Sequence, residues 1–141
     1  MISSSDKGIF LITGIMAAGK STVAQLLAER LEKSVHVRGD MFRKMIVNGK
    51  EEMTSSPSNE ALSQLRLRYK LAASVTSEYF QAGFNVVWQD VILGEMLQEA
   101  VDSIRHRPLY VFVLSPRPDV VATREAERLK KRVWCARYRF A

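Results

Sequence analysis

The chain has 141 residues, a mass of 16.0 kDa and 47% hydrophobic residues, which fits one domain with a sizeable core. No apolar stretch reaches the length of a membrane span, and the N-terminus lacks the pattern of a secretory signal peptide. The single cysteine, Cys135, excludes an internal disulfide and a zinc cluster of cysteines. We therefore expect a soluble, cytoplasmic protein without a membrane partner, and the sequence predicts no particular oligomeric state.

The formal net charge is +6, and most of the basic excess lies between Arg117 and Ala141. A basic segment of this kind suits three roles: clamping phosphate groups, contacting nucleic acid, or ending the chain in solvent. Of these roles, only the clamping of phosphate groups connects directly to the glycine-rich segment at residues 14–21.

This first strand, Gly8–Thr13, leads into a glycine-rich loop and then into a helix. Residues 14–21 read Gly-Ile-Met-Ala-Ala-Gly-Lys-Ser and fit the phosphate-binding pattern GxxxxGK[ST]. Apolar residues at helical spacing predict a helix over Ser21–Leu31, whose N-terminus would point its positive dipole end at the same anion. Strand, loop and helix occur in the order that binding of a nucleoside triphosphate requires. The alternative is a glycine turn that precedes a Lys-Ser pair by chance, and it does not account for the flanking strand and helix.

The chemistry of the loop assigns roles to its residues. Small residues let backbone N–H groups close around a phosphate chain. Lys20 would bridge the β- and γ-phosphates of ATP, and the Ser21 hydroxyl would bind Mg²⁺, so the predicted cofactors are ATP and Mg²⁺. The predicted nucleotide contacts are Gly14, Ile15, Met16, Ala17, Ala18, Gly19, Lys20, Ser21 and Thr22.

Strand-like and helix-like segments alternate along the rest of the chain. The further predicted strands are Ser34–Arg38, Asn85–Asp90 and Leu109–Leu114. The further predicted helices are Met41–Val47, Glu60–Ala82 with Gly83 at its C′ position, Glu95–Ile104 and Pro118–Lys131, and Lys50–Asn59 is a polar loop. Strands separated by helices favour parallel pairing, so we expect a three-layer α/β fold with about four parallel strands flanked by helices. Ligands bind at the carboxyl ends of such strands.

Two carboxylates follow predicted strands at that edge. Asp40 would orient the acceptor hydroxyl and take its proton, and the alternative is an N-cap of the helix that starts at Met41. Asp90 ends an apolar strand in the manner of a Walker B acid and would hold Mg²⁺ through water or directly. Its alternative is a cap of the turn that follows.

Arginines complete the predicted site. Arg38 and Arg43 would line the acceptor side together with Asp40, because guanidinium groups bind phosphate or carboxylate in a bidentate manner. Arg66 and Arg68 could line the same side, but for these two a solvated helix face is the preferred interpretation.

Arg124 and Arg128 are four residues apart on one predicted helix and therefore share a face. They would close over the transferring phosphate and neutralise developing charge. The alternative for both is pairing with surface acids such as Glu125 and Glu127.

Four segments carry a resemblance to a known family: Gly14–Thr22, Arg38–Arg43, Val86–Asp90 and Leu114–Arg128. With these segments the chain resembles P-loop kinases of the adenylate kinase-like superfamily. Within it, the pattern is similar to the small bacterial phosphotransferases related to gluconate kinase, chloramphenicol phosphotransferase and zeta-toxin kinases. The resemblance implies a P-loop NTPase fold, matches Asp40 to the acceptor-binding Asp, and matches Arg124 and Arg128 to lid arginines.

The resemblance ends near Leu129. Such kinases continue with a fifth strand, an adenine-contacting turn and a final helix, whereas residues 130–141 form a basic tail that we expect to be irregular. We therefore expect a kinase-like domain over residues 1–129 that is truncated at its C-terminus.

The resulting functional hypothesis is a kinase that transfers the γ-phosphoryl group of ATP to a hydroxyl of a small molecule. One alternative is a truncated nucleotide-binding protein without catalytic activity. Another, suggested by the basic end, is a 5′-hydroxyl polynucleotide kinase with nucleic acid as its partner. A switch NTPase is disfavoured, because the sequence lacks an Asn-Lys-x-Asp guanine motif and a Gly three residues after Asp90.

Overall fold

The computed structural model describes residues 7–15 and 19–115 in full and residues 135–140 as backbone. Its strands are β1 (Ile9–Gly14), β2 (Ser34–Arg38), β3 (Asn85–Gln89), β4 (Leu109–Leu114) and β5 (Cys135–Phe140). Its helices are α1 (Lys20–Arg30), α2 (Asp40–Lys44), α3 (Asn59–Gln81) and α4 (Glu95–Ser103). The helix predicted over Pro118–Lys131 lies outside the described residues.

The strands form one sheet in the order β2-β3-β1-β4-β5. The first four run parallel, and Ile9 of β1 lies opposite Val86 of β3 on one side and Leu109 of β4 on the other. This arrangement confirms the predicted α/β fold with a parallel sheet flanked by helices. The loops that follow β1, β2 and β3 all leave the same edge of the sheet, where ligands bind in such folds.

The fifth strand differs from our expectation of an irregular tail. β5 pairs antiparallel with β4 along the whole length of both strands. The tail is basic, but Ala136, Tyr138 and Phe140 alternate with two arginines in its sequence. Apolar residues at every second position are typical of a strand with one buried face, and this alternation is the signal that the charge of the segment obscured.

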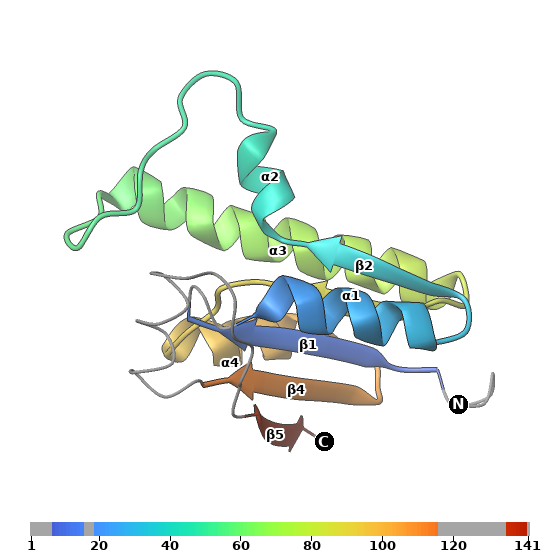
Figure 1. The fold of residues 1–141 in the computed structure, drawn as a ribbon. Helices are drawn as coiled ribbons and strands as arrows, with labels where there is room; N and C mark the ends of the chain where they lie inside the picture. Colours follow the sequence, from blue (N-terminus) through green and yellow to red (C-terminus); the bar gives the residue numbers. More distant parts are fainter. Residues whose placement is uncertain (1–6, 16–18, 116–134, 141) are drawn as a thin grey trace.

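Helices cover both faces of the sheet, and the strand residues alternate to match them. Leu11 of β1 packs in a core with residues of α3 and α4, whereas Ile12 packs in a second core with residues of α1. In β3, Trp88 belongs to the first core and Val87 to the second. Figure 1 shows α1 on one side of the sheet and α3 and α4 on the other.

Helix α3 begins and ends at recognisable signals. At its start, Ser58 Oγ accepts a hydrogen bond from the Ala61 backbone N–H at 3.0 Å. After its end, Gly83 adopts a φ of +98°, which confirms the predicted C′ glycine. Although α3 has 23 residues, neither it nor any other helix in the described part of the chain has the apolar length needed to cross a membrane.

Candidate functional site

The loop between β1 and α1 requires glycine at its two described ends. Gly14 has a φ of +148° and lies so close to the Leu114 backbone carbonyl that a Cβ at this position would overlap it. Gly19 has a φ of +85° and immediately precedes α1. Both conformations are unfavourable for residues with a side chain. Met16, Ala17 and Ala18 lie outside the described residues, so their predicted phosphate contacts remain predictions.

Lys20 is the first residue of α1 and is only 8% exposed. Its Nζ donates a hydrogen bond of 2.7 Å to the backbone carbonyl of Ile15 in the same loop. Burial lowers the pKa of the Lys20 ammonium, while the charge of Asp90 raises it and that of Arg68 lowers it. Within the described residues Lys20 forms no ion pair, so an anion bound at the loop would supply its missing counter-charge.

Ser21 follows with an exposed side chain whose hydroxyl is held by β3. Ser21 Oγ accepts a hydrogen bond of 3.0 Å from Gln89 Nε2. The side-chain oxygen of the same residue, Gln89 Oε1, lies 2.7 Å from His36 Nε2, and the other ring nitrogen of His36 lies 2.9 Å from Gln25 Oε1. Burial is the largest of the effects that lower the pKa of His36. This chain of contacts orients the hydroxyl for which we predict a metal-binding role, and Thr22 lies half-buried beside it in α1.

Gln89 is a site residue that the sequence analysis missed. Because side chains of a strand alternate between its faces, Val87 and Gln89 share the α1 face, whereas Trp88 and Asp90 share the α3 face. The same alternation can be read from the apolar run that ends at Asp90. It places Gln89 on the face covered by α1, the helix that contains Ser21.

Asp90 lies just beyond β3 and is buried, with a side chain that is 0% exposed. Its carboxylate forms an ion pair with Arg68 of α3. It also accepts hydrogen bonds from the Val91 backbone N–H at 2.9 Å and from Trp88 Nε1 at 3.3 Å. Burial raises the pKa of Asp90, and its hydrogen bond and charge interaction with Arg68 oppose this rise. The metal role of Asp90 stays a prediction, and these existing partners favour contact through water over direct coordination.

The preferred interpretation of Arg68 as part of a solvated helix face is wrong. Its side chain is 14% exposed and points to the end of β3, where the Asp90 carboxylate balances its charge. The same interpretation is confirmed for Arg66, which is 56% exposed and pairs with Glu99 at 3.5 Å. Two arginines only two residues apart on α3 therefore have opposite surroundings, because successive positions on a helix face different directions.

Gly39 brings the turn after β2 against the Asp90 carboxylate. A Cβ at position 39 would overlap that carboxylate, and the Gly39 N–H donates to the Gln89 carbonyl at 3.0 Å. The next residue, Asp40, begins α2 with a side chain that is 48% exposed and pairs with Lys44 at 3.0 Å. Gly39 is the N-cap residue of α2, so the alternative role of Asp40 as an N-cap is wrong.

The predicted acceptor-side arginines have different surroundings. Arg38 is exposed at the end of β2. Arg43 of α2 pairs with Glu52 at 2.8 Å and donates to the Glu51 carbonyl at 3.3 Å, so it holds the start of the polar loop. The predicted lid residues Arg124 and Arg128 lie outside the described residues.

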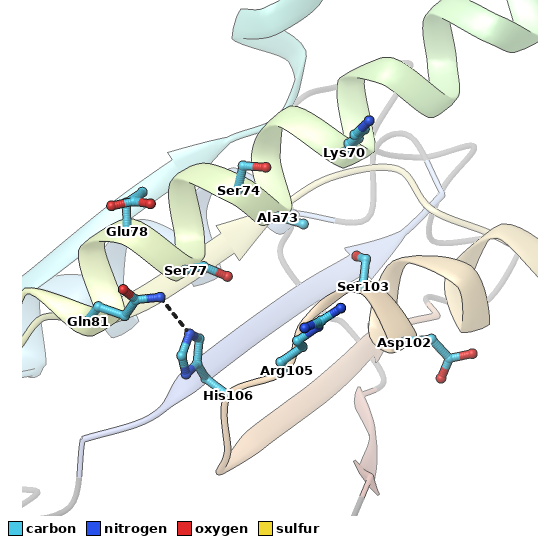
Figure 2. A pocket seen from close by; sticks show the side chains of 10 residues that line it. All are labelled: Lys70, Ala73, Ser74, Ser77, Glu78, Gln81, Asp102, Ser103, Arg105 and His106. Atoms are coloured by element: carbon cyan, nitrogen blue, oxygen red, sulfur yellow. Dashed lines mark hydrogen bonds between the residues drawn. The ribbon is translucent and has the colours of Figure 1, made fainter.

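A groove of about 490 Å³ lies between α3 and the end of α4, away from these residues. Figure 2 shows it lined by side chains of α3 between Lys70 and Gln81 and by Asp102, Ser103, Arg105 and His106. Gln81 and His106 are joined by a hydrogen bond of 3.1 Å. None of the predicted site residues lines it. Among the described residues, no group of three or more His, Cys, Asp or Glu side chains is placed to hold a metal ion. The loop after β1 therefore remains the candidate functional site.

Solved structures share the fold of this chain. A chain of the Pnkp1/Rnl/Hen1 complex is 19% identical with a TM-score of 0.65, and the match covers 84% of this chain but only 38% of that one. A sugar kinase from Janibacter sp. HTCC2649 is 16% identical with a TM-score of 0.63, over 88% of this chain and 69% of that one. The APS kinase of Mycobacterium tuberculosis is 17% identical with a TM-score of 0.58, over 74% and 73%. At these identities the likeness concerns the fold.

Comparison with curated proteins gave no match. Residues 9–134 match the AAA domain family AAA_33, a match that includes the phosphate-binding loop and the four parallel strands. The chain therefore belongs to this AAA domain family, and its fold is P-loop kinase-like.

Proposed function

We propose that this protein is an ATP-dependent kinase that transfers the γ-phosphoryl group to a hydroxyl of a small molecule. The observation that carries the proposal is the buried Lys20 ammonium, which begins α1 directly after the glycine loop and lacks an ion-pair partner among the described residues. The family match and the likeness in fold to a sugar kinase and an APS kinase support the same reaction type.

The proposed nucleotide site extends over residues 14–22, with Lys20 on the β- and γ-phosphates. The residues fit Mg²⁺ as well, because the exposed Ser21 hydroxyl keeps a lone pair after accepting from Gln89 Nε2. When bound, Mg²⁺ would neutralise charge on the phosphate oxygens. Lys20 and the α1 N-terminus hold the phosphate chain, Gln89 orients the Ser21 hydroxyl, and Asp90 would support the ion through water.

The proposed acceptor site lies beside α2. Asp40 is half exposed, and its Oδ2 pairs with Lys44 at 3.0 Å. Its other carboxylate oxygen can therefore accept the proton of an acceptor hydroxyl. Arg38 and Arg43 would bind an anionic group of the acceptor. Arg124 and Arg128 would stabilise the charge that develops on the transferring group.

The test is phosphoryl transfer from Mg²⁺-ATP to a panel of sugars, sugar acids, nucleosides and hydroxylated antibiotics, with Asp40→Asn as the decisive variant. We expect Asp40→Asn to lower the rate on the accepted substrate by about 10²–10⁴-fold, the usual contribution of a general base. Binding of Mg²⁺-ATP should stay unchanged, because Asp40 contacts the acceptor. The matched control is Asp102→Asn on α4, which removes an exposed carboxylate of the groove between α3 and α4, where no predicted site residue lies. Equal transfer rates in Asp40→Asn and the unchanged protein would contradict the assignment.

A second candidate is a 5′-hydroxyl polynucleotide kinase. It is favoured by the net charge of +6 and by the likeness in fold to chains of the Pnkp1/Rnl/Hen1 RNA repair complex. An oligonucleotide with a 5′-hydroxyl belongs in the same panel. A steep fall of its affinity with salt concentration would favour this candidate over the small-molecule acceptor.

A further inference from the structure

The ion pair between Arg68 and Asp90 connects three elements of the proposed site. Arg68 lies on α3, Asp90 follows β3, and the Asp90 carboxylate lies against Gly39 in the turn before Asp40. Both charges of the pair also act on Lys20 at the start of α1. The pair therefore lies between the side that would bind phosphate and the side that would bind the acceptor.

We propose that Arg68 is a positioning residue of this site, which holds the Asp90 carboxylate against the Gly39–Asp40 turn and prevents it from pairing with the Lys20 ammonium. The proposal rests on the proposed function, because it assigns Lys20 to phosphate.

Charge balance in the buried region supports this role. Asp90 has no solvent exposure, so its carboxylate needs a cation nearby. Arg68 forms the ion pair with Asp90, and the charge of Asp90 also raises the pKa of the Lys20 ammonium. Lys20 instead donates to the Ile15 carbonyl, a neutral group that a phosphate oxygen can replace at little cost. Without Arg68, the Asp90 carboxylate would draw the Lys20 ammonium away from the loop.

The hydrogen bonding of Arg68 argues against a purely stabilising role. Arg68 Nε is buried and has no hydrogen-bond partner among the described residues. A buried ion pair with an unsatisfied donor is often no more stable than apolar residues of similar volume. The Asp90 carboxylate of the pair lies against Gly39, and both charges of the pair act on Lys20. These interactions at the site give a reason for a buried ion pair that adds little to stability.

The experiment measures binding of inorganic triphosphate without Mg²⁺ by calorimetry, which probes the Lys20 site independently of any metal role of Asp90. We expect Arg68→Ala to weaken binding about tenfold or more, which corresponds to about 1.4 kcal/mol. The double variant Arg68→Ala with Asp90→Asn should regain most of the affinity, because no free carboxylate remains to attract Lys20. Arg66→Ala, which removes the exposed arginine of the same helix, is the matched control and should bind like the unchanged protein.

Circular dichroism and thermal denaturation establish that each variant is folded at the temperature of the titration. If Arg68→Ala does not fold, Arg68→Gln gives the same comparison, since glutamine keeps a hydrogen bond to Asp90 without neutralising it. A merely structural role of Arg68 would leave the double variant as weak as the single one, and that result would overturn the proposal. So would a folded single variant that binds triphosphate like the unchanged protein. Failure of the unchanged, folded protein to bind triphosphate would instead contradict the proposed function itself.

Discussion

Replacing Gly39 with alanine is expected to lower the free energy of unfolding by about 3 kcal/mol, through overpacking against a buried ion pair. The added methyl group would overlap the Asp90 carboxylate. That carboxylate has little freedom to move, because Arg68 and the Val91 N–H hold it. The backbone of Gly39 has a φ of −61°, which alanine adopts readily, so the predicted loss is steric alone. Urea denaturation monitored by circular dichroism measures it.

Gly8→Ala is the matched control for this prediction. A Cβ at Gly8 would meet the Tyr110 and Phe10 rings at 3.4–3.5 Å, which is ordinary van der Waals contact. We therefore expect Gly8→Ala to change the unfolding free energy much less than Gly39→Ala. Equal unfolding free energies for Gly39→Ala and the unchanged protein would show that Asp90 does not lie against the turn.

The second large effect is expected for Trp88→Ala, with a loss of about 3–5 kcal/mol typical of a large core aromatic. Trp88 of β3 is fully buried and packs in the core that α3 and α4 cover. Its Nε1 also donates to Asp90, so the variant removes one of the groups that hold the carboxylate. Urea denaturation again gives the free energy of unfolding.

Two variants show how much of this loss is specific to the Trp88 side chain. Trp88→Phe keeps most of the apolar contact and should cost less than Trp88→Ala. Leu93→Ala removes a side chain that is 48% exposed and should stay within about 0.5 kcal/mol of the unchanged protein. A Trp88→Ala variant as stable as Leu93→Ala would contradict the assignment of Trp88 to the core.

The backbone architecture follows from local sequence patterns. The glycine loop between an apolar strand and a segment with apolar residues at helical spacing predicts β1, α1 and their connection. Alternating strand and helix segments predict the parallel sheet. These features depend on residues close in sequence, so a single sequence carries them. The strand β5 also has a local signal, the alternation of apolar residues with arginine, which the basic charge of the segment masked.

The side-chain geometry of the site is less accessible from the sequence. The pairing of Arg68 with Asp90 joins residues 22 positions apart and depends on the rotation of α3 about its axis, which the local pattern does not specify. The contact of Gly39 with Asp90 depends on the packing of neighbouring strands. Gln89 is the exception, because strand parity alone places it on the α1 face with Ser21.

The central claim is a nucleotide site supported by Lys20, and calorimetric titration with Mg²⁺-ATP of the unchanged protein and of Lys20→Ala tests it most directly. Lys70→Ala, which removes an exposed lysine of α3, is the control. We predict that the unchanged protein and the control bind Mg²⁺-ATP alike and that Lys20→Ala loses about a hundredfold in affinity, or about 3 kcal/mol. A folded protein that binds no Mg²⁺-ATP, or equal binding by Lys20→Ala, would contradict the account.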